Sequence, residues 1–303
     1  MERISVIIPA RNVAQFLPEA LASVQAQGLR DPEVVVVDDG STDRTADVAG
    51  SFPGVRVLRQ AASGSGRARN AGIEATTGEL IAFLDADDVW TRDKSAAQLA
   101  MLQADPGLGM VFSDMVGFDA AGQAATTYFH ERGFDGRCTA SSIFLYDMVS
   151  TPTVILRRDC LREVGMFDAT LPIGQDTDLW FRIALRQRFA CVPRPLVRRR
   201  LHAGNVTKNS RLLARCVDEI WGRYLDACIE REPEMAAIMR SDYARKRWGH
   251  FFVEGCSLLH EGQAPEGRRM LARAIGVAPW SPRPYAFYLA SLLGLGSGRE
   301  AVR

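Results

Sequence analysis

The chain has 303 residues, of which 47% are hydrophobic and 24% charged, and its formal net charge is +1. This length allows one large domain or a medium domain with a smaller module, and the composition is ordinary for folded globular proteins. The nearly neutral balance gives no overall field to attract a polyanion, so we expect no nucleic-acid partner.

The cysteines and the N-terminus also exclude some classes of protein. No two cysteines form a C-x-x-C pair, which argues against a zinc knuckle or a compact disulfide framework. The apolar run Val6–Ile8 is too short for a signal-peptide core, and no later run reaches the length of a membrane span. We therefore expect a cytoplasmic protein, with peripheral contact at the inner face of the membrane as an alternative. We expect mostly buried thiols at Cys138, Cys160, Cys191, Cys216, Cys228 and Cys256.

Four short apolar runs predict strands in the first third of the chain. They span residues 4–8, 34–37, 55–58 and 80–84. The segments between them have helical spacing, which is clearest over residues 13–24, where Pro18 suits a first helical turn. Strands that alternate with helices predict an α/β fold with a mainly parallel sheet and helices on both faces.

An acidic segment, Asp38-Asp39-Gly40-Ser41-Thr42-Asp43, follows the second predicted strand. Open α/β sheets bind ligands beyond the carboxyl ends of their strands. A carboxylate at this position can accept a hydrogen bond from the imide N–H of a uracil ring. Two alternatives are a simple turn with a helix cap at Ser41 and the paired acids of phosphate-accepting receiver domains.

A glycine-rich segment over residues 63–72 follows the third predicted strand. It is not a dinucleotide-binding loop, because Arg69 stands where that motif needs its last glycine and the loop does not follow the first strand. Its glycines let the backbone approach a ligand, and Arg67 and Arg69 supply positive charge for a diphosphate. A flexible loop without function is the alternative.

A second acidic segment, Asp85-Ala86-Asp87-Asp88, follows the fourth predicted strand. Its carboxylates two residues apart can turn toward one ligand. Mg²⁺ and Mn²⁺ prefer oxygen ligands and often bind between one or two carboxylates and substrate phosphates. The alternative is a polar turn that caps a helix beginning near Thr91.

The pattern changes near residue 209 to long helical segments, so we expect a catalytic domain over residues 1–207 and an all-helical C-terminal module over 208–303. Glu261-Gly262 predicts a break between two helices, and a second helix starts at Ala264. Prolines at 279, 282 and 284 predict a loop before a last apolar helix over 285–295. For that helix, core or subunit packing is favoured over contact with a membrane surface, because no cationic face accompanies it.

In this order the segments resemble the nucleotide-binding half of glycosyltransferase family 2, whose catalytic domain has the GT-A fold, a Rossmann-like arrangement. Residues 5–12 resemble the opening strand of that family, and the two acidic segments and residues 68–72 follow at the expected distances. Residues 158–167 and 174–180 resemble its acceptor-side region, and Arg200-Leu201-His202 its late basic motif. The resemblance covers about residues 4–206.

The resemblance implies roles for single residues. Asp39 is expected to contact the nucleotide base, Arg69 to help hold the nucleotide, and Asp85 to meet the ribose side. The implied site residues are Pro9, Arg11, Asp39, Arg69 and Asp85 for the nucleotide, Asp87 and His202 for a divalent cation (Mn²⁺ or Mg²⁺), and Asp176 as the catalytic base.

Two positions depart from the family pattern. Arg11 occupies a position that is often aromatic in the family, although an arginine plane can also stack on a base. Gln175 stands where a glutamate commonly precedes the catalytic aspartate. Alternatives to the implied roles are a helix N-cap formed by Asp176 or Asp178, with Asp178 favoured for the structural role, and a partly buried or loop position for His202.

The expected function is transfer of a hexose from a nucleoside diphosphate sugar, with UDP as the favoured nucleotide, to a hydroxyl of a carbohydrate or glycoconjugate acceptor. Such transfer belongs to polysaccharide or glycoconjugate synthesis. It needs charge stabilisation at the leaving diphosphate, which a cation at Asp87 would provide, and one carboxylate to take the acceptor's proton. Glycosidases instead flank the bond with two carboxylates, so a lone carboxylate predicts direct displacement with inversion.

Two other functions remain open from the sequence. A sugar-phosphate nucleotidyltransferase shares a nucleotide-binding α/β sheet, but it expects a glycine-rich loop directly after the first strand, where this chain has Pro9-Ala10-Arg11-Asn12. A catalytically silent nucleotide-sugar-binding protein would keep the pocket as a recognition site. The helical module also makes an oligomer an open expectation.

Overall fold

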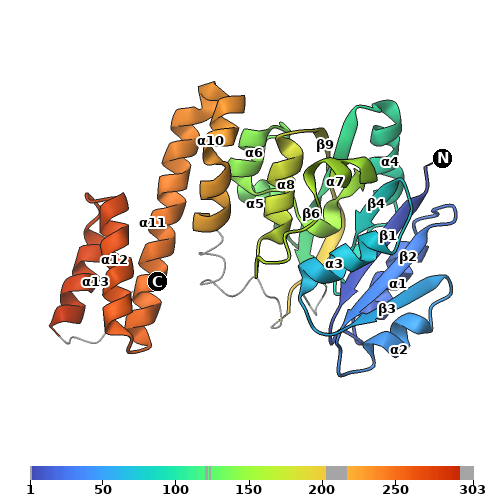
Figure 1. The fold of residues 1–303 in the computed structure, drawn as a ribbon, viewed down its shortest axis with the longest axis horizontal. Helices are drawn as coiled ribbons and strands as arrows, with labels where there is room; N and C mark the ends of the chain where they lie inside the picture. The colour runs from blue at the N-terminus through green and yellow to red at the C-terminus, as the bar shows by residue number, and fades with distance from the viewer. Residues whose placement is uncertain (1, 120–121, 123, 203–216, 294–303) are drawn as a thin grey trace. The chain divides into compact units, whose positions relative to one another are not determined.

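The computed structural model describes residues 2–119, 122, 124–202 and 217–293 of the chain (Figure 1). Contacts divide the chain into two compact units, Met1–Gly204 and Asn205–Arg303. The domain boundary expected at residues 207 and 208 lies outside the described residues.

The first unit is built on a sheet of nine strands within the described residues, in the order β3-β2-β1-β4-β8-β6-β9-β5, with β7 paired to β6. The four adjacent strands β3, β2, β1 and β4 run parallel to one another, as do β6 and β9. Strands β8 and β5 pair antiparallel with their neighbours. The strands are β1 (Ile4–Ala10), β2 (Glu33–Asp39), β3 (Val55–Gln60), β4 (Leu80–Phe83), β5 (Val89–Trp90), β6 (Leu108–Phe118), β7 (Ala124–Thr127), β8 (Ile155–Arg157) and β9 (Arg188–Arg200).

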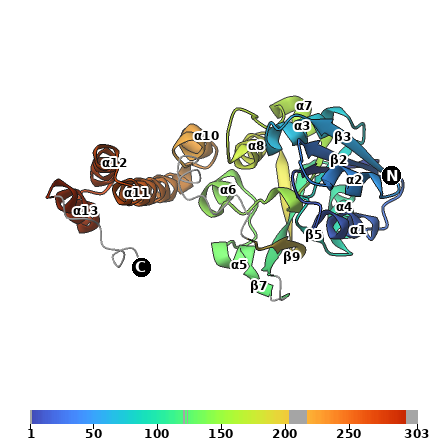
Figure 2. The same ribbon diagram turned by 90° about the horizontal axis from the view of Figure 1, so that it is seen from below.

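Helices cover both faces of this sheet, so the expected α/β fold class is confirmed. Figure 2 shows α3, α7 and α8 on one face and α1 and α4 on the other. The helices are α1 (Leu17–Gln25), α2 (Thr45–Gly50), α3 (Ser65–Glu74), α4 (Lys94–Ala104), α5 (Tyr128–Arg132), α6 (Ala140–Tyr146), α7 (Arg158–Val164) and α8 (Gln175–Ala184), and η1 (Thr151–Thr153) is a 3-10 turn.

Side chains that alternate along the strands explain the two layers. In β2, Val36 packs in the cluster that includes Leu17 and Leu21 of α1, whereas Val35 and Val37 pack with Ala68 of α3. Successive strand residues point to opposite faces, so a fully apolar strand must be covered on both sides. The unbroken valine run of β2 therefore requires helices on each face of the sheet.

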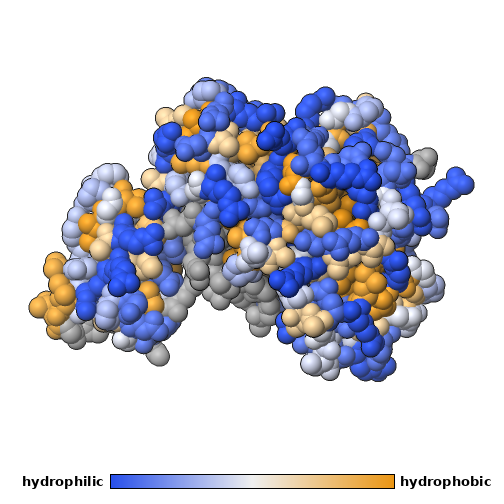
Figure 3. Space-filling model, viewed as in Figure 1, coloured by the Kyte–Doolittle hydropathy of each residue, from blue (hydrophilic) through white to orange (hydrophobic). Residues whose placement is uncertain are grey.

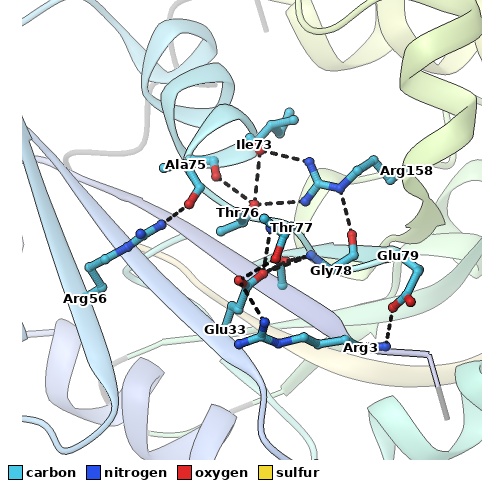
Figure 4. A network of polar contacts seen from close by, with 12 residues as sticks. Arg3, Glu33, Arg56, Ile73, Ala75, Thr76, Thr77, Gly78, Glu79 and Arg158 are labelled. Atoms are coloured by element: carbon cyan, nitrogen blue, oxygen red, sulfur yellow. Dashed lines mark hydrogen bonds and ion pairs between the residues drawn. The ribbon is translucent and has the colours of Figure 1, made fainter.

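Arg158 at the start of α7 fixes the end of α3 (Figure 4). Its guanidinium donates to the carbonyl oxygens of Ile73 and Gly78 and to Thr76 Oγ1, at 2.9, 2.7 and 3.0 Å. The last carbonyls of a helix have no partner within the helix, and a forked cation satisfies several at once. The helix that carries Arg69 is thus tied to a segment more than 80 residues later in the chain.

Glu33 at the start of β2 organises the turn that follows α3 (Figure 4). Its carboxylate accepts hydrogen bonds from Ser5 Oγ and from the backbone N–H groups of Thr77 and Gly78, at 2.6, 2.8 and 2.9 Å, and pairs with Arg3. Burial raises the pKa of Glu33, but these hydrogen bonds outweigh it and lower the pKa to about 2.

Glu33→Gln is therefore expected to destabilise the protein at neutral pH by about 1–2 kcal/mol, since solvent screens part of the interaction. Because folding lowers this pKa, the stabilisation is present above the ordinary value of 4.5 and is lost as the pH falls toward 2. Thermal unfolding between pH 3 and 7 should show the parent and the variant converging at the acid end. Curves that stay parallel would contradict the assignment, and exposed Glu74→Gln is the control.

The second unit is helical throughout its described residues. Its long helix α11 packs against α12, and α12 against α13. The predicted break at Glu261-Gly262 is confirmed, whereas the last helix begins at Pro282, so two of the three prolines lie in its first turn rather than in a loop. The elements are η3 (Val217–Trp221), α10 (Gly222–Arg231), η4 (Pro233–Met235), α11 (Ala236–His260), α12 (Ala264–Val277) and α13 (Pro282–Leu292).

Two further expectations concern the thiols and membrane spans. Cys160, Cys228 and Cys256 are buried free thiols, and Cys138 and Cys191 are half-buried free thiols, while Cys216 lies outside the described residues. Among the residues that the structure describes, no helix has the length and apolar content needed to cross a membrane.

Candidate active site

The loops that follow three neighbouring parallel strands lie together at the carboxyl-terminal end of the sheet. Strands β2, β1 and β4 lie side by side and run in the same direction, so their carboxyl ends meet. Pro9 is half-buried near the end of β1 and Arg11 is exposed just beyond it. Asp39 ends β2, and the acidic segment 85–88 follows β4. This end of the sheet therefore brings together most of the residues expected to bind a nucleotide.

The loops after β1 and β2 are joined to each other. Asn12, in the left-handed region at φ 52°, accepts from Thr42 N at 2.8 Å, and its own N–H donates to Ser41 Oγ at 3.0 Å. Gly40 has φ +72°, and a Cβ there would meet the backbone nitrogen of Ala62 at 2.7 Å. Only glycine combines that backbone conformation with so close an approach.

Asp39 holds the loop that leads into α3. Its Oδ1 accepts from Gln60 Nε2, Ser63 N–H and Ser63 Oγ at 2.7, 2.8 and 3.1 Å, and its Oδ2 accepts from Gly64 N–H at 2.8 Å. Burial raises the pKa of Asp39, but these donors outweigh it, so its pKa is lowered and the carboxylate is ionised. Oδ2 accepts only one of these bonds, which leaves a lone pair for another donor.

Arg69 of α3 and Asp85 after β4 form a partly buried ion pair. Arg69 Nη2 lies 2.7 Å from Asp85 Oδ1, and the two side chains are 8% and 33% exposed. The guanidinium also lies 5.5 Å from the centroid of the Phe167 ring, while its Nε has no hydrogen-bond partner among the described residues. By contrast Arg67, the other arginine of the loop, is exposed.

Asp87 meets His202, which lies 115 residues later in the chain. Asp87 Oδ2 and His202 Nε2 are 2.9 Å apart, and the imidazole packs on the Phe16 ring with centroids 5.0 Å apart. Strand β5 directly follows the acidic segment and pairs with β9, which ends just before His202. This pairing explains why two residues so distant in sequence meet.

Asp88 is the buried member of the acidic segment. Its Oδ1 accepts from Arg200 N–H at 3.0 Å, and Arg200 Nε donates to the carbonyl oxygen of Asp87 at 3.1 Å. Burial, together with the charges of Asp85 and Asp87, raises the pKa of Asp88 well above its ordinary value. Part of this rise comes from the negative charges of Asp85 and Asp87, which a bound cation would offset.

Asp176 lies in the first turn of α8. Its Oδ2 accepts from Thr151 Oγ1 at 3.1 Å and its Oδ1 from Thr177 N–H at 2.9 Å. Asp178 is 1% exposed and pairs with Arg182 at 2.8 Å, and Arg182 also donates to the carbonyl oxygen of Met166. Asp178 thus serves the fold, while Asp176 keeps free lone pairs.

Three helix caps expected as alternatives are absent from the described residues. Gly174, not Asp176 or Asp178, occupies the N-cap position of α8. Helix α4 begins at Lys94 with Asp93 at its N-cap, and α2 begins at Thr45, so neither the segment 85–88 nor Ser41 caps a helix. The cap interpretations of these polar residues are therefore wrong.

Asp87 and His202 are the residues that could hold a divalent cation. They offer one carboxylate oxygen and one imidazole nitrogen, which lie close enough together to bind the same cation. No group of three or more His, Cys, Asp or Glu side chains suited to a metal occurs in the described part of the chain. Two protein donors fit Mg²⁺ or Mn²⁺ where substrate phosphates supply the remaining ligands.

Several residues of this site were not predicted from the sequence. Thr151, the donor to Asp176, lies in a segment without a motif, and Phe16 supports His202 from α1's N-terminal side. Gln60 and Ser63 orient Asp39. Among the described residues, the side chain of Asp176 forms its hydrogen bonds with Thr151 and Thr177 and none with the segment 85–88.

The sequence of this chain is similar to those of known glycosyltransferases. The model of the family described as glycosyl transferase family 2 matches residues 5–165. An uncharacterised glycosyltransferase of Rickettsia prowazekii is 25% identical over 235 residues, which cover 76% of this chain and 73% of that protein. The amylovoran biosynthesis glycosyltransferase of Erwinia amylovora is 29% identical over 63% of this chain and 67% of its own length.

Solved structures share the fold. TarS of S. aureus in complex with UDP-GlcNAc matches with a TM-score of 0.62 at 17% identity, over 96% of this chain and 92% of that chain. The mannosyltransferase of Pyrobaculum calidifontis, in complex with GDP-Man and Mn²⁺, matches with a TM-score of 0.62 at 20% identity, over 97% and 81% of the two chains.

Proposed function

Because the chain belongs to glycosyl transferase family 2, we propose that it is a metal-dependent, inverting enzyme that moves a hexose from a UDP-linked sugar to an acceptor hydroxyl. The observation that carries the proposal is the convergence of Asp39, the Arg69–Asp85 pair and the Asp87–His202 pair at the carboxyl ends of adjacent parallel strands. The nucleotide sugars bound by TarS and the mannosyltransferase support the donor class.

The site residues divide the work between binding and proton transfer. Asp39 accepts the imide N–H of the base, and Arg69 balances negative charge beside Asp85, which faces the ribose. Asp87 and His202 hold the cation, which when bound offsets charge on the departing diphosphate. Asp176 takes the proton of the acceptor hydroxyl. One carboxylate in this role fits direct displacement, and hence inversion at the anomeric carbon.

Asp39→Ala is expected to weaken uridine and UDP binding by roughly 10-fold or more while leaving the response to Mn²⁺ intact, because the lost contact is to the base. Calorimetric titration with uridine and with UDP, each with and without Mn²⁺, measures both effects. Asp39 also holds the loop at Ser63 and Gly64, so Ser63→Ala, which weakens the loop contact alone, is the control. Equal losses in the two variants would show that Asp39 acts only through the loop.

The donor is tested by thermal shift with UDP-, GDP- and dTDP-sugars in the presence of Mn²⁺. A ligand that binds the folded state raises the melting temperature, and we expect the largest rise with a UDP-sugar. The sugar-phosphate nucleotidyltransferase alternative lacks support, because Pro9 and Ala10 at the end of β1 and Arg11 and Asn12 just beyond it stand where that class has a glycine-rich segment. If none of the nucleotide sugars raised the melting temperature, the proposal would be contradicted.

The acceptor and the setting complete the proposal. We expect a carbohydrate or glycoconjugate acceptor, in keeping with the amylovoran biosynthesis for which the Erwinia relative is named, and a location in the cytoplasm or peripherally at the inner face of the membrane. Leu289 and Leu292 of α13, and Leu293 directly after it, are 56–73% exposed. Figure 3 shows an orange, hydrophobic area in the region of α13. Subunit packing is the use we propose for them, tested by light scattering of the parent and Leu289→Glu.

A further inference from the structure

The turn η1 presents a buried hydroxyl to Asp176. Thr151 and Thr153 are each 1% exposed, and Thr151 Oγ1 donates to Asp176 Oδ2 at 3.1 Å. Thr153 Oγ1 instead donates to the carbonyl oxygen of Ser150 within the turn itself. Two threonines of the same turn therefore have different partners, one in the site and one in the local backbone.

The turn is anchored from outside by two side chains. Trp90 Nε1 donates to the carbonyl oxygen of Pro152 at 2.9 Å, and Gln98 Nε2 donates to that of Thr153 at 2.7 Å. The Nζ of buried Lys94 lies 4.1 Å from the centroid of the Trp90 ring. Hydrogen bonds to successive carbonyls of one short turn fix its backbone, and with it the direction of the Thr151 side chain.

Trp90 also connects this turn to the metal side of the site. It belongs to β5, which follows the segment 85–88 and pairs with β9, the strand that ends just before His202. The short strand β5 thus supports Asp87 through the chain and Asp176 through Pro152 and Thr151. The metal side and the base side of the proposed site are thus both linked to β5.

We propose that Thr151 is the positioning residue of the base: it fixes the Asp176 carboxylate by a hydrogen bond to Oδ2 while Thr177 N–H fixes Oδ1. This inference rests on the proposed function of Asp176. With one donor on each oxygen, rotation of the carboxylate is restrained and one lone pair on each oxygen stays free for the acceptor hydroxyl. A base held within a few tenths of an ångström of its working position contributes more than a freely rotating one.

The test compares Thr151→Val, Thr151→Ser and the matched control Thr153→Val in Mn²⁺-dependent hydrolysis of a UDP-sugar. Valine keeps the shape of threonine but removes the donor, so we expect kcat to fall roughly 10-fold to 100-fold while KM for the donor and the melting temperature stay near the parent's values. Serine should restore most of kcat. Thr153→Val should lower the melting temperature and leave kcat almost unchanged.

Parental kcat in Thr151→Val would overturn the proposal, as would a loss that follows the melting temperature or that serine fails to restore. Asp176→Asn, measured in parallel, separates this inference from the function on which it rests. If Asp176→Asn retains turnover, the base assignment is wrong. If Asp176→Asn is inactive while Thr151→Val is parental, the base stands and only the positioning role is wrong.

Discussion

Asp176→Asn is expected to lower turnover by roughly 10²-fold to 10⁴-fold while donor and metal binding stay near normal. Asparagine keeps the shape of the side chain and one acceptor oxygen, so the contact with Thr151 or Thr177 N–H can persist, but it cannot take up the acceptor's proton. Steady-state kinetics with the donor varied, and calorimetric titration of UDP with Mn²⁺, measure the two properties separately.

Asp178→Asn is the matched control for this prediction. Asp178 is buried and paired with Arg182, which itself binds the backbone at Met166. Loss of one partner from a buried ion pair destabilises the fold, so we expect a lower melting temperature with a much smaller loss of turnover. Comparable kinetic losses in both variants, or a loss in Asp176→Asn that follows its melting temperature, would place the base elsewhere.

Asp87→Ala is expected to abolish the effect of Mn²⁺ on UDP affinity, a loss of roughly 10-fold to 100-fold when Mn²⁺ is present. The variant removes the carboxylate that lies 2.9 Å from His202, and with it the proposed oxygen ligand of the cation. Calorimetry with and without Mn²⁺ measures the difference directly. An Mn²⁺ effect equal to the parent's would show that Asp87 does not bind the cation.

His202→Ala provides a graded comparison with Asp87→Ala. The imidazole supplies the second donor, and it also packs on Phe16. We expect a smaller loss of the Mn²⁺ effect than in Asp87→Ala, because Mg²⁺ and Mn²⁺ favour carboxylate oxygen over imidazole nitrogen. A larger loss in His202→Ala would reverse the assignment of the principal ligand.

The first half of the sheet was predictable because its strands are local apolar runs of ordinary length. Residues 4–8, 34–37 and 55–58 all form strands, and the fourth predicted strand, 80–84, ends one residue early at Phe83. The carboxyl-end rule predicted that the acidic segments lie at the same end of the sheet. The break at Glu261-Gly262 also carried a local signal. Each of these features depends on residues close together in the sequence.

The remaining features depend on contacts between distant residues, which no local pattern encodes. The return of His202 to Asp87 requires the pairing of β5 with β9, and the link from Trp90 through Pro152 and Thr151 to Asp176 joins the three separate elements β5, η1 and α8. The cap interpretations were wrong for a related reason: side chains that suit caps formed tertiary hydrogen bonds instead, as Ser41 does with Asn12.

Release of nucleoside diphosphate from a UDP-sugar without acceptor distinguishes the proposed transferase from both alternative functions. We expect slow release that requires Mn²⁺ and is lost in both Asp87→Ala and Asp176→Asn. Binding of the UDP-sugar without any release would indicate a catalytically silent binding protein. Formation of a nucleotide sugar and pyrophosphate from UTP and a sugar phosphate, in place of UDP release, would show that the protein is a nucleotidyltransferase and not a glycosyltransferase.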